Sequence, residues 1–176
     1  MIDTVFERAN KIRLLVLDVD GVLTDGSLYI SDSGEEFKAF NTLDGHGMRM
    51  LKETSVEIAI ISGRTSRSVS QRAQDLEIGL LYQGVIDKLA VFRELLREHA
   101  IDSEASAFMG DDLPDLPCMC HAGFAVSVPA APALVRENAH YVTKQQGGRG
   151  AVRKACELIM QAQGTLEEQF ARFLRV

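Results

Sequence analysis

Residues 14–26 read Leu14-Leu15-Val16-Leu17-Asp18-Val19-Asp20-Gly21-Val22-Leu23-Thr24-Asp25-Gly26. The four apolar residues at the start predict a short strand that is buried on both faces. Side chains alternate along a strand, so we expect Asp18 and Asp20 to leave its carboxyl end on the same side. Two carboxylates this close repel each other and need a cation or a shared proton. An acidic turn is the plainer interpretation, but ligands bind at the carboxyl ends of strands in open α/β sheets, which favours a site.

Strands and helices alternate along the rest of the chain. Apolar runs predict further strands over 56–61, 80–82, 105–109, 124–128 and 141–143. Helical spacing predicts helices over 4–11, 44–52, 66–76, 87–99, 131–138 and 151–163. Turn residues predict a β-hairpin over about 27–40, and an amphipathic tail covers about 165–176. The alternation predicts an α/β fold, a doubly wound parallel sheet with helices on both faces, in one domain over residues 1–176.

The composition excludes several classes of protein. The 176 residues carry a formal net charge of −6, whereas nucleic-acid-binding proteins usually present a basic surface. An anionic substrate is compatible with this charge, because a metal and a few cations can reverse the field within one cleft. No apolar run reaches the about 20 residues that a membrane span needs. The three cysteines have no disulfide-framework spacing and the N-terminus has no signal-peptide pattern. We therefore expect a cytoplasmic protein without a nucleic-acid or membrane partner.

Chemically useful side chains also follow other predicted strands. Ser62 follows the second buried strand, Asp111 follows the strand 105–109, and Lys88 opens a helix. In a doubly wound sheet these ends lie side by side. Together with Asp18 and Asp20, Asp111 would offer the hard oxygen ligands that suit Mg²⁺. Ser62 and Lys88 could hold phosphate oxygens, so the combination indicates phosphate chemistry.

These residues carry a family resemblance. Four motifs resemble those of the haloacid dehalogenase superfamily of phosphatases, namely Asp18-Val19-Asp20-Gly21-Val22-Leu23-Thr24, Ser62, Lys88 and Gly110-Asp111-Asp112-Leu113-Pro114-Asp115. Further runs resemble the narrower family of 3-deoxy-D-manno-octulosonate 8-phosphate phosphatases, namely residues 21–26, Asp44-Gly45-His46-Gly47, Leu81-Tyr82-Gln83-Gly84 and Gly147-Gly148-Arg149-Gly150-Ala151-Val152-Arg153. The resemblance covers roughly residues 10–163. It implies a phosphatase of lipopolysaccharide sugar biosynthesis.

The resemblance implies a role for each catalytic residue. Asp18 would attack phosphorus and become an aspartyl-phosphate, which splits one hard step into two. Asp20 would protonate the leaving sugar oxygen and then deprotonate the hydrolytic water. Ser62 and Lys88 would hold the oxygens of the transferring phosphoryl group.

A Mg²⁺ ion is part of the same implication. It would bind the Asp18 carboxylate, the backbone carbonyl of Asp20, and Asp111. Asp112 and Asp115 would orient Lys88 and metal-bound waters without touching the metal. For Asp115 a carboxylate at a helix N-terminus is an equally good interpretation.

The expected substrate is a small phosphorylated 2-keto sugar acid, and its carboxylate needs cationic partners. Arg64 and Arg72 are about two helical turns apart and could share a helix face. An arginine fork binds a carboxylate through two parallel hydrogen bonds. Arg149 stands among glycines, including Gly148, where the backbone can approach a ligand closely.

The chain leaves no room for the cap domain that most phosphatases of this superfamily insert. The segment between Asp20 and Ser62 is occupied by the hairpin and a helix, and the segment between Ser62 and Lys88 by a helix and a strand. We therefore expect a capless fold with a protruding hairpin and an open site. The resemblance implies a homotetramer assembled through the hairpin, with the tail packed either on its own domain or near a neighbour's site.

Three alternatives remain open at this point. A nine-carbon 2-keto-3-deoxy sugar acid 9-phosphate would use the same phosphate chemistry. A phosphoaspartate receiver domain also combines aspartates, Mg²⁺, a hydroxyl and a lysine, but it lacks an acid/base residue at the position of Asp20. A catalytically silent scaffold is disfavoured, since every catalytic position is filled.

Overall fold

The computed structural model describes residues 2–174; Met1 and the end of the expected tail, 175–176, lie outside the described residues. Six parallel strands form one sheet in the order β5-β4-β1-β6-β7-β8, which confirms the predicted doubly wound fold. Their bounds are β1 Leu14–Leu17, β4 Glu57–Ile61, β5 Leu80–Tyr82, β6 Ser106–Met109, β7 Phe124–Ser127 and β8 Tyr141–Val142. Strand β1 lies at the centre, and Leu17 pairs with Ile60 of β4 and with Met109 of β6. The carboxyl ends of these three strands are therefore adjacent.

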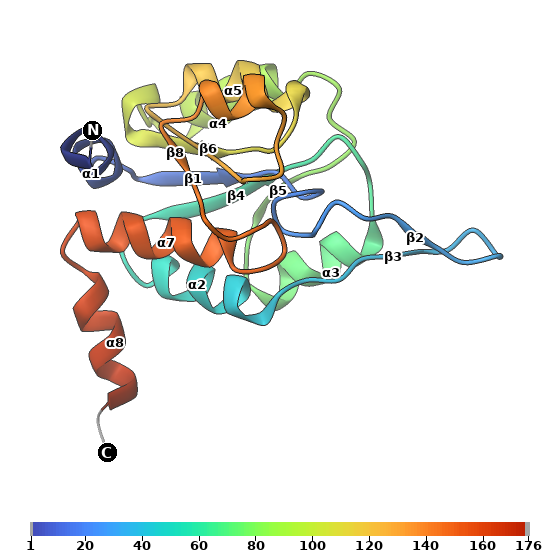
Figure 1. Ribbon diagram of the computed structural model, residues 1–176, viewed down its shortest axis with the longest axis horizontal. Helices are drawn as coiled ribbons and strands as arrows, with labels where there is room; N and C mark the ends of the chain where they lie inside the picture. The colour runs from blue at the N-terminus through green and yellow to red at the C-terminus, as the bar shows by residue number, and fades with distance from the viewer. Residues whose placement is uncertain (1, 175–176) are drawn as a thin grey trace.

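Helices cover both faces of the sheet (Figure 1). The helices on one face are α4 Lys88–Glu98 and α5 Leu116–His121, and those on the other are α2 Thr42–Lys52, α3 Arg67–Asp75 and α7 Ala151–Ala162. The shorter or peripheral elements are α1 Ile2–Asn10, α6 Ala133–Glu137 and the 3₁₀ turns η1 Ser103–Ala105 and η2 Leu113–Asp115. All four side chains of β1 are fully buried, and each contributes about 1.5–3 kcal/mol relative to exposure. The buried apolar side chains form one cluster across the sheet.

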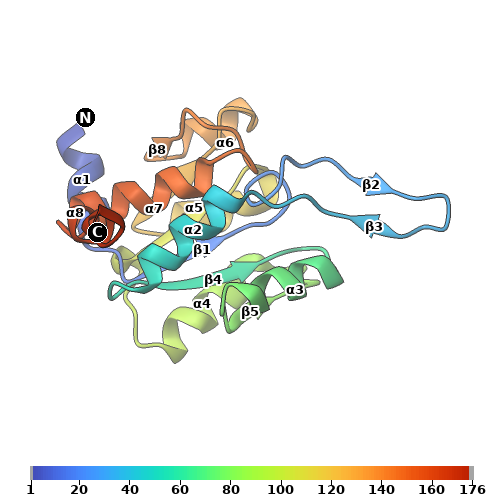
Figure 2. The ribbon, with the colours of Figure 1, turned by 90° about the horizontal axis from the view of Figure 1, so that it is seen from below.

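A hairpin of β2 Tyr29–Ile30 and β3 Glu36–Phe37 projects from the body as a separate two-stranded sheet (Figures 1 and 2). Its paired part is shorter than the expected extended segments, because neither face packs on the core. Between β1 and β4 the chain forms only this hairpin and α2, and between β4 and α4 it forms α3 and β5. All of these residues are described, and none forms a cap domain.

The Asp44-Gly45-His46-Gly47 run lies inside α2, which begins at Thr42, two residues before the predicted start at residue 44. The helix begins earlier because the Asn41 side chain caps it by accepting from the N–H of Leu43 at 2.8 Å. Asp44 is buried and accepts from the N–H groups of Gly150 and Arg153, at 3.1 and 2.7 Å. It therefore caps α7 across the helix pair. A Cβ at Gly47 would lie 2.9 Å from the Cα of Arg153, so this glycine lets the two helices approach.

The tail forms α8 Leu166–Leu174, which extends away from the body (Figure 1). Its ring at Phe173 contacts His46 edge-on at 5.1 Å between centroids, and Arg172 forms an ion pair with Glu53. Phe173 and Leu174 nevertheless stay 64% and 79% exposed. The tail thus rests on its own α2 with one side and leaves an apolar side open. Among residues 2–174, no helix combines the length and the apolar character that crossing a membrane requires.

Candidate active site

The predicted catalytic side chains meet at the carboxyl ends of the three central strands. Asp18 follows β1, Ser62 follows β4, Asp111 follows β6, and Lys88 begins α4. All four line one cavity of about 350 Å³, together with Asp20, Gly26, Gly63, Arg64, Asp112, Pro114 and Asp115. The parallel register produces this convergence, because neighbouring strands in one sheet end at the same edge.

Lys88 lies between two buried carboxylates. Its Nζ donates to Asp18 Oδ1 and to Asp115 Oδ1, both at 2.7 Å, and the lysine side chain is only 8% exposed. Asp87 caps α4 by accepting from the N–H of Ala90 at 3.0 Å, which places Lys88 at the first helical position. Burial lowers the pKa of Lys88, but the charges of Asp18 and Asp115 outweigh burial and raise the pKa overall. The ammonium therefore stays charged and can hold a phosphate oxygen.

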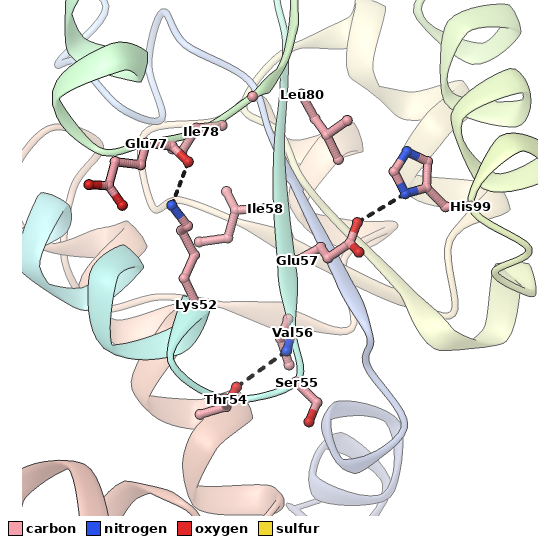
Figure 3. Close-up of a pocket in the computed structure, with 11 residues that line it drawn as sticks. Lys52, Thr54, Ser55, Val56, Glu57, Ile58, Glu77, Ile78, Leu80 and His99 are labelled. Atoms are coloured by element: carbon pink, nitrogen blue, oxygen red, sulfur yellow. Dashed lines mark hydrogen bonds and ion pairs between the residues drawn. The ribbon is translucent and has the colours of Figure 1, made fainter.

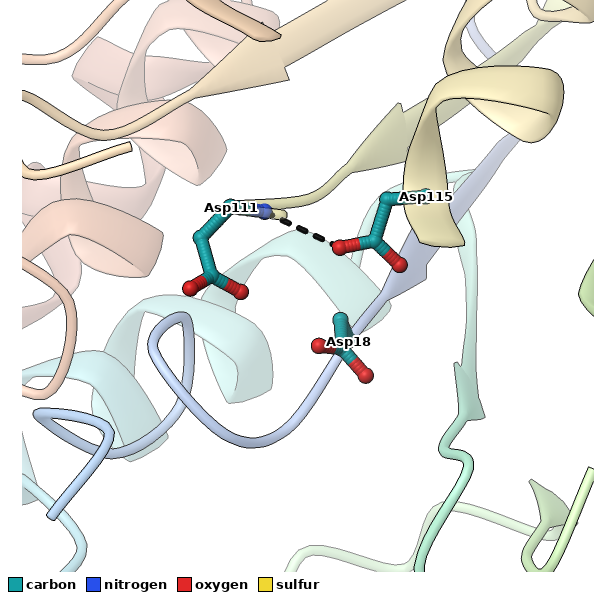
Figure 4. Close-up of side chains that lie close together, drawn as sticks. All are labelled: Asp18, Asp111 and Asp115. Atoms are coloured by element: carbon teal, nitrogen blue, oxygen red, sulfur yellow. Dashed lines mark hydrogen bonds between the residues drawn. The ribbon is translucent and has the colours of Figure 1, made fainter. Parts of the chain in front are cut away.

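The side chains of Asp18, Asp111 and Asp115 lie close together (Figure 4), and the pKa values of Asp18 and Asp111 are raised. Burial, and then the charge of Asp115, raise the pKa of Asp18 to about 6, although Lys88 opposes this. Burial, and then the charges of Asp18 and Asp115, raise the pKa of Asp111 to about 7. Among the described residues, Asp111 Oδ1 is buried without a hydrogen-bond partner. Oxygens of Asp18, Asp111 and Asp115 lie within 4.8 Å of one another, so a hard divalent cation fits this cluster.

Both carboxylate oxygens of Asp115 accept hydrogen bonds within the site. Its Oδ1 accepts from Lys88, and its Oδ2 accepts from the N–H groups of Asp111 and Asp112 at 3.1 and 3.2 Å. Asp111 Oδ1 accepts no hydrogen bond, so Asp111 has more free capacity for a cation than Asp115. Asp112 is exposed and caps η2 by accepting from the N–H of Leu113 at 2.8 Å; the structure does not bring it to Lys88.

Gly21 makes the approach of Asp111 to the first loop feasible. Its φ is +92°, and a Cβ at this position would lie 2.0 Å from Asp111 Oδ2. Any side chain here would displace the carboxylate. The absence of a side chain at Gly21 therefore leaves the space that the Asp111 carboxylate occupies.

Asp20 faces a set of charges that the sequence analysis missed. Lys38, one residue beyond β3, forms ion pairs with Asp20 and, at 3.0 Å, with Glu36. Arg64 forms an ion pair with Glu36, and its Nε lies 3.9 Å from Asp20 Oδ2. Hydrogen bonds from Lys38 and Arg64 hold the pKa of Glu36 below its usual value. No local pattern singles out Lys38, because only the path of the hairpin brings it back to the strand end.

Ser62 is buried, and its backbone N–H donates to the carbonyl of Tyr82 at 2.9 Å. Its Oγ accepts from the N–H of Arg64 at 3.3 Å. The serine is thus fixed by β5 and by the following turn, with its hydroxyl at the cavity.

The predicted arginine pair on one helix face is wrong, because α3 begins at Arg67 and Arg64 precedes it. Arg64 lines the cavity, whereas the Arg72 guanidinium donates to the carbonyl of Asn41 at 3.2 Å. A Cβ at Gly45 would lie 2.1 Å from Arg72 Nη2, so Arg72 packs against the start of α2. The structure does not bring Arg72 to the cavity.

Arg149 lines a second cavity of about 560 Å³ beside the first, and the two cavities share Gly26 and Asp111. Its Nη2 lies 3.7 Å from Asp25 Oδ2. Gly148 donates its N–H to the carbonyl of Val22 at 2.9 Å, which ties this loop to the loop after β1. Arg149 therefore faces a cavity that adjoins the cavity of Asp18 and Lys88.

A different cavity, of about 420 Å³, lies at the amino ends of β4 and β5 (Figure 3). Its Lys52 donates to the carbonyl of Leu76 at 2.9 Å, and His99 Nδ1 lies 3.0 Å from Glu57. These charged groups pair with other groups of the protein. They lie at the amino ends of the strands, whereas Asp18 lies at the carboxyl ends.

Comparisons with known proteins agree with this geometry. The family model for haloacid dehalogenase-like hydrolases matches residues 81–155. The chain is 48% identical over 165 residues to the 3-deoxy-D-manno-octulosonate 8-phosphate phosphatase KdsC of Yersinia pestis, covering 94% of this chain and 88% of that protein. It is 49% identical to KdsC of Escherichia coli K12, covering 93% and 87%. The crystal structure of the Moraxella catarrhalis phosphatase with magnesium, phosphate and KDO has a TM-score of 0.96 and 40% identity, and covers 98% of this chain and 99% of that one.

We expect Mg²⁺ to stabilise the folded protein, and to do so more at about pH 8 than at about pH 5. The folded protein keeps protons on Asp18 and Asp111 up to about 6 and 7, whereas the unfolded chain releases them near 3.8. Without metal, the free energy of unfolding therefore falls as the pH rises through this window. Bound Mg²⁺ relieves the repulsion and stabilises by about 2.7 kcal/mol at a hundredfold excess over its Kd.

Thermal unfolding with EDTA or with Mg²⁺ at both pH values measures this effect. Asp111→Asn should lose most of the Mg²⁺ stabilisation and should be more stable than the wild type in EDTA at the higher pH. An unchanged response to Mg²⁺ in Asp111→Asn would place the metal elsewhere.

Proposed function

The chain belongs to the 3-deoxy-D-manno-octulosonate 8-phosphate phosphatase family of haloacid dehalogenase-like hydrolases, and we propose that it hydrolyses this phosphate ester with Mg²⁺. The products are 3-deoxy-D-manno-octulosonate and inorganic phosphate, in lipopolysaccharide sugar biosynthesis. The observation that carries the proposal is the buried contact of Lys88 with Asp18 at the end of β1, beside the unpartnered oxygen of Asp111.

The proposed reaction proceeds in two displacements. An oxygen of Asp18 attacks phosphorus as the bond from phosphorus to the sugar oxygen breaks, and Asp20 donates a proton to that oxygen. Asp20 then removes a proton from water, which attacks phosphorus and releases phosphate from Asp18. Lys88 holds the orientation of Asp18 throughout and, with Ser62, binds the oxygens of the transferring group.

Asp18 and Asp111 would hold Mg²⁺, together with the backbone carbonyl of Asp20. The bound ion would supply positive charge that offsets the repulsion between the phosphate and the carboxylates. Asp115 keeps Lys88 and the loop after β6 in place for this arrangement.

Asp18→Asn is expected to reduce turnover by more than about 10³-fold, because the amide is nearly isosteric but a poor nucleophile. Asp20→Asn should slow both displacements, by about 10²–10⁴-fold. Phosphate release from the eight-carbon sugar acid phosphate measures turnover, and mass spectrometry of acid-quenched protein detects the aspartyl-phosphate. Asp102→Asn, on an exposed residue before η1, is the matched control. Full activity of Asp18→Asn would overturn the covalent route.

We propose that the sugar acid extends from the phosphate site into the neighbouring cavity and that Arg149 binds its carboxylate. The two cavities share Gly26 and Asp111, and Arg149 is exposed there with Asp25 as its weak partner at 3.7 Å. Gly148 holds the loop against the chain after β1. Arg64, which lines the phosphate cavity, could reach the hydroxyls near the ester.

Arg149→Ala should raise KM for 3-deoxy-D-manno-octulosonate 8-phosphate by about tenfold or more, since a hydrogen bond to a charged group contributes about 1.5–3 kcal/mol. It should leave 4-nitrophenyl phosphate nearly unaffected, because that substrate has no carboxylate. Arg72→Ala should instead lower stability with little selectivity between substrates. Equal losses on both substrates in Arg149→Ala would exclude the assigned contact. A nine-carbon 9-phosphate hydrolysed with a higher kcat/KM than the eight-carbon substrate would favour that alternative.

We further propose a homotetramer assembled through the hairpin. Leu28, Tyr29, Ile30 and Phe37 are about half or more exposed on it, and exposed apolar groups gathered on one projection are typical of interaction surfaces. Neighbouring subunits would then cover sites that have no cap. The open apolar side of α8 is available for the same assembly.

Light scattering of the wild type should give the mass of a tetramer, and Ile30→Lys should give smaller species with reduced turnover, because the charge would be buried in the interface. Leu134→Lys, on an exposed apolar residue of α6, should keep the wild-type mass. A monomeric wild type with full activity would contradict the covered site. If deletion of residues 165–176 unfolds the protein, the result would favour packing of the tail on its own domain.

We place the reaction in the cytoplasm. The three cysteines are free, and Cys120 is exposed, which suits a reducing compartment.

A further inference from the structure

A buried lysine joins the root of the hairpin to the proposed acid/base residue. The Lys38 side chain is 1% exposed although its backbone lies in the projecting hairpin, just after β3. Lysine is almost never fully buried unless it is paired, and here it is paired with Asp20 and with Glu36. Burial fixes the long side chain at the strand end before any ligand binds.

Arg64 is the second cation near Asp20. Its guanidinium pairs with Glu36, and its Nε lies 3.9 Å from Asp20 Oδ2. Glu36 therefore holds both cations in place, so that Asp20, Lys38, Glu36 and Arg64 form a cluster with balanced charge. The Asp20 and Glu36 side chains are about one-fifth exposed, which leaves Asp20 open to the cavity.

We propose that Lys38 is a positioning residue that orients the Asp20 carboxyl for proton transfer, an inference that rests on the proposed phosphatase function. Lys38 contacts Oδ1 of Asp20. An ammonium group donates hydrogen bonds and accepts none, so Oδ1 remains an acceptor in both protonation states. The transferable proton is thereby confined to Oδ2. In the first displacement this proton passes to the sugar oxygen, which keeps the electron pair of the broken bond to phosphorus.

This role gives the hairpin a catalytic purpose besides assembly. In a capless fold no inserted domain can orient the acid/base group when substrate binds. Lys38 supplies that constraint from the hairpin root, and any subunit contact that holds the hairpin also holds Asp20.

The leaving group provides the test. The first displacement limits kcat/KM, and a primary alkoxide needs a proton from Asp20 whereas 4-nitrophenolate leaves without one. Lys38→Met should therefore lower kcat/KM by at least about tenfold for the sugar acid phosphate and for a simple primary alkyl phosphate. The loss for 4-nitrophenyl phosphate should be several times smaller. Lys38→Arg, which keeps a buried donor, should recover part of the loss.

Two controls separate positioning from structure. Lys52→Met removes a lysine that donates to the carbonyls of Leu76 and Glu77 at the far end of the sheet (Figure 3), and it should not discriminate between leaving groups. Lys38→Met combined with Asp20→Asn should lose no more activity than Asp20→Asn alone, because both changes remove the same proton transfer. If Lys38→Met fails to fold, Lys38→Gln carries the same comparison, because its amide carries no charge and can accept as well as donate, so that it no longer confines the proton to Oδ2.

Equal losses on alkyl and aryl phosphates, additive losses in the double variant, or no loss would each overturn the inference. Equal losses would indicate that Lys38 binds the phosphate or only supports the hairpin. Failure of the proposed function can be told apart from failure of this inference. In the first case the wild type would not hydrolyse the sugar acid phosphate, but the comparison of leaving groups could still be made with the simple alkyl phosphate and 4-nitrophenyl phosphate.

Discussion

The contact of the Lys88 ammonium with two buried carboxylates is the interaction on which the active end of this molecule depends. Lys88 lies 2.7 Å from Asp18 and 2.7 Å from Asp115. Breaking a buried ion pair by removing one partner costs about 3–5 kcal/mol, because the remaining charge is uncompensated. The loops after β1 and β6 and the start of α4 are thus held at one point. The charge that Lys88 leaves unbalanced, on Asp18 and Asp111, is what makes the cluster suitable for a divalent cation.

The hairpin lies next to a site that no cap domain covers. A phosphoryl site open to water loses electrostatic strength, since solvent screens the groups that hold the phosphate. Here the root of the hairpin brings Lys38 and Glu36 to Asp20 and Arg64, while its outer part presents apolar side chains. The hairpin therefore contributes Lys38 and Glu36 to the charge cluster at its root and carries exposed apolar side chains on its outer part.

Sequence reasoning succeeded where a residue's place follows from the strand before it, and it failed where a helix packs on another helix. Asp18, Ser62 and Asp111 could be assigned because each follows a recognisable strand. The cap that Asp44 provides could not be predicted, because the N–H groups that donate to its carboxylate lie at the start of α7 and are far away in the sequence. Helical spacing predicted that Arg72 lies in the site. In the structure its guanidinium instead packs over Gly45 and donates to the carbonyl of Asn41, at the start of α2.

The sequence by itself determined the doubly wound sheet and the aspartates at its central edge, whose carboxylates suit a divalent cation. Apolar runs and strand ends are local features, and a parallel sheet places successive strand ends at one edge without further information. Only the tertiary structure decided that Lys38 reaches Asp20, that Asp115 is occupied by Lys88 and two backbone N–H groups, and that Asp44 caps α7. These contacts join segments whose relative position depends on the packing of the whole chain, and no periodicity in the sequence records it.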